Sequence, residues 1–396
     1  MTRNLYKGKR QNKKERSRGR ARRVRLTPTV LILLCVLIIV TFILSYYGVL
    51  PFKIFPSNDD ESSTINVELV KSQDLSIHFL ELGNKYTGDC TLIKVGNTEV
   101  LIDAGSKTSS IPTITNYLNQ YVEDNTLEYV IVTHAHEDHY AGFATNENEN
   151  SLFDYYQVEM LIQFAQITDG KAEQVMYQNY LREVNELIDA GTTVYTAKEC
   201  VEETDGAQSI YQLNDKIKLE ILDQRFYHEV AANENNHSVC CQIIQNDDKY
   251  YLFTGDLEKS GEQSLVASNT LHPVELYKAG HHGSKTSSHD VLLEVIKPKN
   301  VCVCCCAGSS EYTDTNENQF PTQEFIDRVA PYTSDVFVTT LCLNYKDDKF
   351  ESMNGNIVVY CNQYDNEATV TCSNNKTILK NTKWFKNNRN LPPAWS

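Results

Sequence analysis

The first 52 residues contain almost no negative charge. Residues 1–25 hold 12 Lys and Arg side chains against one acid, Glu15, and residues 26–52 hold no charged side chain of either sign. The shortage of acids argues against a folded segment and predicts a basic arm over residues 1–25. Residues 26–52 are not expected to form a solvated surface segment, because they carry no charge and residues 30–44 are almost wholly apolar. A helix of about 22 residues is roughly 33 Å long and can cross a bilayer core of about 30 Å. We therefore predict a transmembrane anchor over residues 26–50.

This apolar segment also lacks the signature of a cleaved signal peptide. A signal peptide has an apolar region of about half this length and a small-x-small cleavage site, which residues 45–48 match poorly. Tyr46 and Tyr47 fit an aromatic belt at the membrane interface, and the basic arm is expected on the cytoplasmic side. The sequence thus predicts a single-pass protein of the cell membrane with a cytoplasmic N-terminus and an extracellular main domain. A cleaved signal peptide and a buried core helix are the alternatives.

Basic residues are scarce after the arm. Without residues 1–25 the chain has 25 basic and 51 acidic residues, a net charge of about −26. Such a surface repels polyanions and disfavours avid, non-specific binding of long nucleic acids. We expect a polar spacer over residues 51–73, a globular domain over 74–363 and a basic, Trp-containing tail over 364–396. The tail is expected to be solvated, and docking on an anionic surface is the alternative.

The twelve cysteines do not form a recognisable disulfide framework. Cysteines of an exported domain usually pair, but Cys240-Cys241 and Cys304-Cys305-Cys306 are chain neighbours inside apolar, strand-like runs. Eleven cysteines follow the anchor, an odd number that cannot all pair within one chain. We therefore predict thiols that pack as small core side chains.

Apolar, β-branched runs and helical patterns follow one another over the globular part. They predict strands at 75–82, 90–95, 99–103, 127–133, 237–245, 250–254, 275–278, 301–307, 336–340 and 357–361. Helices are expected at 111–122, at 172–190 with an end at Gly191, and near Val291 and Phe325. Two halves of this kind predict an α/β protein, a four-layer αβ/βα sandwich with its active site at the strand ends.

The run from Thr133 to Gly142, Thr-His-Ala-His-Glu-Asp-His-Tyr-Ala-Gly, follows a predicted strand and packs four potential metal ligands into six positions. We expect His134 and His136 to bind one metal ion, and Asp138 and His139 to bind a second. Imidazole and carboxylate ligands suit Zn²⁺, Mn²⁺ or Fe²⁺, and two ions about 3.5–4 Å apart activate water for hydrolysis. The spacing predicts half of a two-metal hydrolase site, with Zn²⁺ or Mn²⁺ as the cofactor.

Two later loops complete the predicted ligand set. Asp256 follows a strand that ends in Thr-Gly, where the small Gly255 lets the backbone approach the ions. His281 and His282 lie in a glycine-flanked loop after another strand. We expect His282 to bind metal and His281 to lie near the substrate. The residues that follow could contact a substrate phosphate or form a plain polar loop: Ser284, Lys285, Thr286 and Ser287.

Taken together, these motifs resemble the metallo-β-lactamase superfamily, and within it the hydrolase domain of ComEC-type DNA-uptake proteins. The resemblance extends from Ile77 to Asn362. It rests on residues 77–83 with Gly88-Asp89, residues 101–105, the metal loop, and residues 235–239, 253–256 and 280–284. It implies an αβ/βα fold, two metal ions, and hydrolysis of a phosphoester or a related bond.

The sequence departs from that pattern in two ways. DNA-uptake members embed this domain in a multi-spanning channel, whereas one span is expected here, so DNA transport by this chain alone is not expected. Many superfamily members also place a third histidine ligand before the Gly-Asp strand, and the candidate here is His237. Asp103 is expected to orient the metal loop through hydrogen bonds, with a turn-forming role as the alternative. The other histidines are expected to be structural or exposed: His78, His228, His272 and His289.

The predicted function is phosphodiester hydrolysis by a membrane-anchored, outward-facing enzyme with two divalent ions. Asp138 is expected to act in catalysis as a metal ligand, and His281 to protonate the leaving oxygen. The acidic domain favours small phosphodiesters or short oligonucleotides over long duplex DNA as substrates. The alternatives are an esterase of the phosphocholine esterase kind, acting on cell-wall or lipid material, and a metal-stabilised surface binding module without turnover.

Overall fold

The computed structural model describes residues 65–396, so the predicted arm, the anchor and the spacer up to residue 64 lie outside the described residues. Within residues 65–396, no helix has both the length and the apolar character needed to cross a membrane. The described end of the predicted spacer contains a short helix, α2 (Val67–Lys71), whose first turn is capped by the Asn66 side chain. Val70 of this helix packs into the core.

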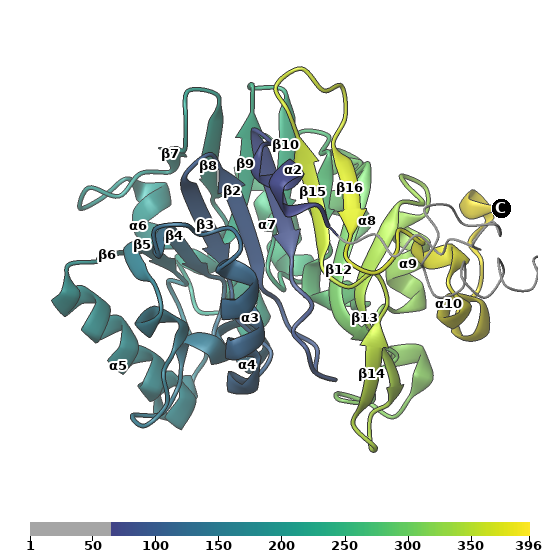
Figure 1. Cartoon of the computed structure of the whole chain (residues 1–396), viewed down its shortest axis with the longest axis horizontal. Coiled ribbons are helices and arrows are strands. Elements are labelled where there is room, and N and C mark those ends of the chain that lie inside the picture. The colour runs from purple at the N-terminus through teal and green to yellow at the C-terminus, as the bar shows by residue number, and fades with distance from the viewer. Residues whose placement is uncertain (1–64) are drawn as a thin grey trace, which may run out of the picture. The chain divides into compact units, whose positions relative to one another are not determined.

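Two eight-stranded sheets form the centre of the described domain, residues 65–396 (Figure 1). The first sheet has the order β16 (Thr369–Cys372), β15 (Ile357–Cys361), β1 (Leu75–Phe79), β2 (Thr91–Val95), β3 (Thr98–Ile102), β4 (Thr126–Val132), β5 (Gln157–Gln163) and β6 (Thr193–Thr196). Its strands β3 to β6 run parallel, and the others pair antiparallel.

The second sheet repeats this plan with later parts of the chain. Its order is β14 (Lys349–Ser352), β13 (Val336–Asn344), β12 (Asn300–Ala307), β11 (Leu276–Lys278), β10 (Lys249–Phe253), β9 (Cys240–Gln245), β8 (Ile217–Leu222) and β7 (Ile210–Gln212). Strands β10 to β13 are parallel, and the outer pairs are antiparallel. Each sheet therefore combines a parallel centre with antiparallel edges.

The sheets pack face to face and carry helices on their outer faces. Phe79 of β1 and Phe253 of β10 meet between the sheets, with ring centroids 6.3 Å apart. The first sheet is covered by α3 (Ile111–Leu118) and α5 (Val175–Ala190), and the second by α7 (Lys259–Ser268), α8 (Asp290–Ile296), α9 (Gln323–Val329) and α10 (Lys383–Asn388). Two short helices, α4 (Glu137–Tyr140) and α6 (Ala197–Glu202), lie in connections. These layers are consistent with the predicted αβ/βα sandwich.

Helical periodicity explains how the covering helices pack against the sheets. On α3, Ile114 and Leu118 are four residues apart, and both are fully buried. Burial of each such side chain contributes roughly 1.5–3 kcal/mol. Helix α5 ends at Gly191, whose φ of 103° is the left-handed value that glycine adopts most easily, so the predicted stop is confirmed.

The cysteines fill both cores as thiols. Ten of the eleven cysteines in residues 65–396 are buried, and Cys342 is partly exposed. Side-chain alternation along β12 places Cys302 and Cys304 between the sheets and Cys305 beneath the outer helices. Because these positions are buried on both faces of the strand, the prediction of core thiols is confirmed.

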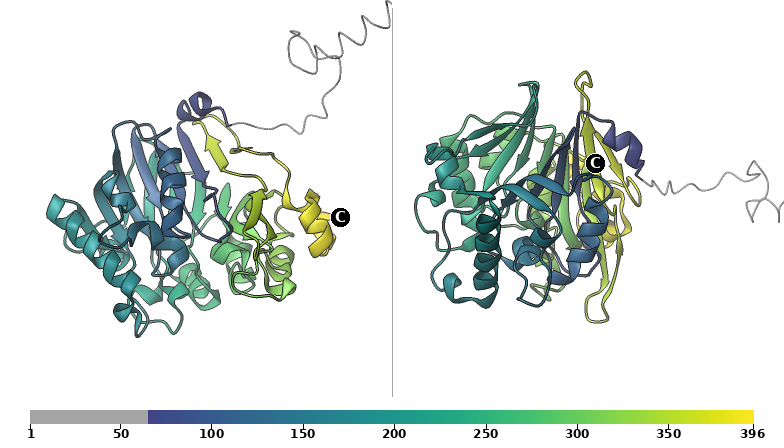
Figure 2. Two further views of the ribbon diagram at one scale, coloured as in Figure 1. Left: turned by 60° about the horizontal axis from the view of Figure 1, so that its bottom comes forward. Right: turned by 60° about the vertical axis from the view of Figure 1, so that its left-hand side comes forward.

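The segment from residue 364 is part of the fold and differs from the expected solvated tail. Strand β16 extends the first sheet beside β15. Farther on, Trp384, Phe385 and Trp395 belong to the core beneath the helices of the second sheet. Figure 2 (left) shows this yellow C-terminal end beside the green strands and helices that precede it. The expected domain boundary at residue 363 therefore falls inside the sandwich.

The motifs of the sequence meet at one edge of the two sheets. Asp103 follows β3, and His134 follows the parallel neighbour β4. In the second sheet, Asp256 follows β10 and His281 follows its parallel neighbour β11. Since parallel strands end at the same edge, both halves deliver their polar side chains to one place.

Candidate metal centre

Asp103 fixes the start of the metal loop, residues 133–142. Its carboxylate accepts the backbone N–H of Thr133 (2.8 Å) and the hydroxyl of Thr133 (2.7 Å). It also lies 2.8 Å from Nδ1 of His139. This hydrogen bond places a proton on Nδ1 and leaves Nε2 of His139 as the ligand atom. Asp103 thus has the contacts that the sequence predicted for it.

Two glycines allow the backbone to come close to the metal loop. A Cβ on Gly105 would lie only 1.7 Å from the carbonyl oxygen of Asp138. Gly255 has a φ of 51°, and a Cβ there would meet the Ser238 side chain at 2.7 Å and Thr133 at 3.1 Å. Any larger residue at these positions would push the ligand-bearing loops apart.

His134 and His136 face each other. Nε2 of His134 lies 3.0 Å from Nδ1 of His136, and His134 is fully buried. Two neutral imidazoles at this distance need either a proton or a cation between them. Burial and the neighbouring His139 lower the pKa of His134 well below its usual value, which favours the neutral, metal-binding form.

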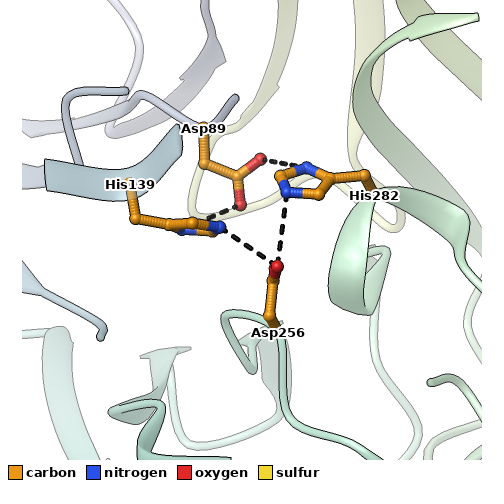
Figure 3. Close-up of side chains that lie close together, drawn as sticks. All are labelled: Asp89, His139, Asp256 and His282. Carbon is orange, nitrogen blue, oxygen red and sulfur yellow. Dashed lines mark ion pairs between the residues drawn. The ribbon is translucent and has the colours of Figure 1, made fainter. Parts of the chain in front are cut away.

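A second group of ligand atoms meets at Asp256. Its Oδ2 lies 3.2 Å from Nε2 of His139 and 3.3 Å from Nε2 of His282 (Figure 3). Nε2 of His282 is also 3.4 Å from Oδ2 of Asp138. All four side chains are buried or nearly so. They come from both sheets, so the fold itself assembles this group.

Asp89 lies on the opposite side of the two imidazoles. Its carboxylate is 3.2 Å from Nδ1 of His282 and 3.7 Å from Nδ1 of His139, whereas Asp256 faces the Nε2 atoms (Figure 3). Nδ1 of His282 is also 2.9 Å from the Cys304 carbonyl oxygen. Asp89, His139, Asp256 and His282 together could hold a metal ion. Because Asp89 faces the protonated nitrogens, we assign it to orienting the histidines and leave Asp138 as the ligand.

Several of these ligand atoms have no hydrogen bond within the described residues. They are Nε2 of His139, Nε2 of His282 and Oδ1 of Asp256. Buried polar atoms are normally satisfied, and an unsatisfied one is expensive unless an ion or water completes it. The arrangement therefore fits a cation.

The electrostatics of the group point the same way. Burial disfavours a charged His139, but Asp256 and Asp103 outweigh it and raise the pKa of His139 to about 10. Likewise, Asp256 and Asp89 overcome burial and raise the pKa of His282 well above its usual value. In the metal-free protein, protons on these histidines supply the positive charge that the buried carboxylates require. A divalent ion can replace them.

His281 lies at the border between the metal group and the open site. Its Nδ1 is 2.9 Å from the Thr286 hydroxyl, and its Nε2 is 3.9 Å from Asp256. Asn235 reaches the same ring at 3.4 Å. His281 is thus farther from Asp256 than His282 is, as expected for the residue nearer the substrate.

His237 lies apart from these groups. Its Nε2 accepts the backbone N–H of Ala231 (2.8 Å), and its Nδ1 lies 3.4 Å from Glu234. Both ring nitrogens are therefore occupied by protein groups. These contacts argue against the candidate third ligand of the first ion, and we omit His237 from the ligand set.

A cavity of about 360 Å³ opens over the metal group. Its walls include His136, Asp138, Asp256, His281, Glu311 and Tyr312. The Tyr312 hydroxyl donates to Oδ2 of Asp138 at 2.6 Å. The loop of Ser284, Lys285, Thr286 and Ser287 is tied to the protein: Thr286 contacts His281, Lys285 donates to Asn318, and Ser287 donates to the Leu257 carbonyl.

Sequence reasoning missed three residues of this site. Asp89 stands in a motif quoted above but received no role. Lys278, a buried lysine at the end of β11, forms an ion pair with Asp89 and lies 3.8 Å from Asp256. Tyr312 lies in a loop without a recognisable motif. The signal for Asp89 was the Gly-Asp pair at residues 88–89, and Lys278 precedes the two histidines in the same short run.

Comparison with protein families identifies the region around the metal loop. Residues 83–145 match the sequence profile of the Metallo-beta-lactamase superfamily. This stretch contains Asp89, Asp103 and the four ligand positions of the loop. The resemblance predicted from the motifs is therefore confirmed for this part of the chain.

Two curated proteins match parts of this chain. Recombination protein 2 of Haemophilus influenzae is 28% identical over 128 residues, 31% of this chain and 15% of that protein. ComE operon protein 3 of Bacillus subtilis is 32% identical over 72 residues, 18% of this chain and 9% of that protein. The matches thus span a small fraction of either relative.

Solved structures with a similar chain trace include the metallo-beta-lactamase fold protein YhfI from Bacillus subtilis. It is 10% identical, the match covers 68% of this chain and 96% of that one, and the TM-score is 0.37.

Proposed function

We propose that this protein is a hydrolase with two divalent metal ions that cleaves phosphodiesters. The observation that carries the proposal is a convergence of buried ligand atoms: Nε2 of His139 and Nε2 of His282 lie 3.2 and 3.3 Å from Oδ2 of Asp256. Neither of these Nε2 atoms, nor Oδ1 of Asp256, has a hydrogen bond within the described residues, which supports a cation as the missing partner. The match to the Metallo-beta-lactamase superfamily supports hydrolysis as the chemistry.

The ligand atoms divide into two groups. His134 and His136 would hold the first ion, and Asp138, His139 and His282 the second. Asp256, whose Oδ2 lies beside His139 and His282, would be a ligand as well. Histidine and carboxylate ligands fit Zn²⁺ and Mn²⁺. When bound, such ions lower the pKa of water and neutralise charge on the phosphoryl oxygens.

The protein's own residues would then orient the substrate and move a proton. His281 borders the cavity, and its contact with the Thr286 hydroxyl holds the ring in place. We assign it the protonation of the leaving oxygen through Nε2. Tyr312 keeps Asp138 turned towards His282 through a hydrogen bond from its hydroxyl to the carboxylate.

The cavity favours a small substrate. A volume of about 360 Å³ suits a small phosphodiester or the end of a short oligonucleotide. Among the described residues that line it, the lysine is Lys107, which is already paired with Glu137 at 2.5 Å. Long duplex DNA would also meet the net negative charge of the chain after residue 25. We further propose that residues 26–50 anchor the enzyme in the cell membrane, with the catalytic domain outside.

A substrate panel tests the proposal. Protein with Zn²⁺ or Mn²⁺ is assayed on bis-p-nitrophenyl phosphate, short oligonucleotides, long duplex DNA and a phosphocholine ester, with Asp256→Asn as the inactive control. We expect metal-dependent cleavage of the first two with the highest kcat/KM. Preferred cleavage of the phosphocholine ester would support the esterase alternative. Metal binding without turnover on any substrate would support the binding module.

A further inference from the structure

The C-terminal segment packs against one wall of the metal site. That wall is the Tyr312 loop, defined here as residues 308–321, which runs from the end of β12 towards α9. Its regular structure is a single short turn at Asn316–Asn318. Such a loop must have its backbone carbonyls satisfied by other parts of the protein.

Arg389 satisfies three of these carbonyls at once. Its Nε donates to the carbonyl oxygen of Pro321 (2.9 Å), and its Nη2 donates to those of Gln319 (2.6 Å) and Asn316 (3.2 Å). Its Nη1 also reaches the Asn316 side chain at 3.2 Å. Arg389 is only 9% exposed. Among the ion pairs of residues 65–396, none includes Arg389, so its partners here are carbonyls and amides of the loop and its neighbours.

A tryptophan holds Arg389 in this position. The guanidinium lies 4.8 Å from the ring centre of Trp384, a cation–π distance. Trp384 in turn lies against Gly308, the first residue of the loop, where a Cβ would come within 2.5 Å of the indole nitrogen. Both ends of the Tyr312 loop therefore contact the C-terminal segment.

The other side of the loop contacts the proposed metal ligands. Tyr312 donates to Asp138, and Phe320 packs against the rings of His281 and His282 with centroids 5.8 and 6.0 Å apart. Tyr312 and Phe320 also contact each other, with centroids 5.7 Å apart. A shift of the loop would thus release one ligand and remove the packing of two histidines.

We propose that Arg389 is a positioning residue of the metal site: it fixes the Tyr312 loop, so that Tyr312 holds Asp138 and Phe320 supports His281 and His282. The expected effect of Arg389 on catalysis rests on the proposed function. Its effect on the Tyr312 loop and on metal affinity can be measured without substrate. It assigns a role to a segment whose composition alone predicts a solvated tail.

The first test measures the loop and the metal site directly. In the full-length protein, Arg389→Gln is compared with Lys386→Gln, which removes the same charge from an exposed side chain on α10. We expect a glutamate-specific protease to cut after Glu311 or Glu317 at least tenfold faster in Arg389→Gln only. We also expect the Zn²⁺ affinity of Arg389→Gln to fall about tenfold, because loss of a residue that orients a metal ligand typically weakens metal binding by this amount.

Two further variants separate positioning from general destabilisation. Arg389→Lys keeps the charge but cannot reach three carbonyls, so it should lie between wild type and Arg389→Gln. Tyr312→Phe should lower Zn²⁺ affinity without opening the loop to protease, and the double variant Arg389→Gln/Tyr312→Phe should lose little more affinity than Arg389→Gln alone. Unchanged protease sensitivity and affinity in Arg389→Gln would overturn the proposal, as would an equal effect of Lys386→Gln.

Kinetics distinguish this proposal from the proposed function. If wild type cleaves phosphodiesters, Arg389→Gln should lower kcat/KM at least tenfold, and saturating Zn²⁺ should not restore it fully because Phe320 has also moved. Full activity of Arg389→Gln at saturating Zn²⁺, with an exposed loop, would overturn the catalytic part. If wild type cleaves nothing, the proposed function fails, while the protease and affinity measurements still decide the role of Arg389.

Discussion

Lys278 and Asp89 form an ion pair inside the metal site, where each side chain is only 4% exposed. Burial raises the pKa of Asp89, but Lys278, His282 and His139 together outweigh it and hold this pKa below its usual value. Asp89 in turn faces Nδ1 of both His139 and His282. The pair therefore provides a fixed carboxylate beside Nδ1 of two proposed ligands, on the side opposite their Nε2 ligand atoms.

Replacing Lys278 by Met should destabilise the metal-free protein strongly. The change removes the lysine side of the buried pair and leaves Asp89 with the two histidines alone, and breaking one side of a buried pair costs about 3–5 kcal/mol. Urea unfolding of chelator-treated protein measures this. The double variant Lys278→Met/Asp89→Asn, which carries no unpaired charge, should regain most of the loss. Lys349→Met changes an exposed side chain and serves as the control. A loss below about 1 kcal/mol in Lys278→Met would show that the pair does not stabilise the site.

Asp103→Asn should weaken metal binding rather than folding. An amide cannot accept from Thr133 and His139 together as the carboxylate does, so the His139 ring loses its fixed orientation. Loss of such a partner typically lowers metal affinity 10–100-fold. Zn²⁺ titration against a chromogenic chelator gives the value. Asp205→Asn removes the same charge from an exposed aspartate with a similar left-handed φ of 54°, and it should bind Zn²⁺ like wild type.

The sequence predicts the centre of the fold well and its edges poorly. Strands β1 to β3 and β9 to β12 contain nearly continuous buried runs, and β4 ends in three buried residues, which the apolar pattern reveals. By contrast, β5 and β6 have partly exposed residues, and β7 has only three residues, Ile210–Gln212. Short, mixed patterns of this kind do not differ from loops until a neighbouring strand pairs with them.

In the site, too, the parts formed by a local pattern could be predicted, and the parts formed by contacts between distant segments could not. The metal loop is local, so its spacing alone predicts which side chains can meet. Lys278 gains its role only because β10 and β11 are parallel neighbours and Asp89 comes from the other sheet. Tyr312 depends on contacts with a segment about 75 residues later in the chain, which no local pattern reveals.

The number of bound ions follows from the two ligand groups. Protein prepared without chelator should contain about two divalent ions per chain by elemental analysis. Asp138→Ala should retain about one, because the Asp138 carboxylate lies 3.4 Å from Nε2 of His282, a ligand assigned to the second ion. Asp169→Ala, at an exposed position, should retain both. Wild type without bound ions would refute the metal centre, and an unchanged count in Asp138→Ala would remove Asp138 from the ligand set.

His78 should make the folded state sensitive to mild acid. This histidine is fully buried, and its ring nitrogens lie 2.9 Å from the Tyr117 hydroxyl and 2.8 Å from the Ser76 hydroxyl. Burial, aided by the charge of Lys94, lowers its pKa to about 3. Its unfolded pKa is about 6.5. Between these values the unfolded chain binds the proton and the folded protein does not, so stability must fall as the pH falls below 6.5.

The expected loss is about 2 kcal/mol of unfolding free energy between pH 7.5 and pH 5. A His78→Gln variant should be less stable at pH 7.5 because of altered packing, but it should lack this part of the pH dependence. Urea unfolding of both proteins at pH 7.5, 6 and 5 gives the slope of unfolding free energy against pH for each. Both proteins contain the same metal ligands, so the titration of those ligands cancels in the difference between the two slopes. Equal slopes would mean that His78 accepts its proton within the fold, and then its two hydroxyl partners would have to rearrange around an imidazolium.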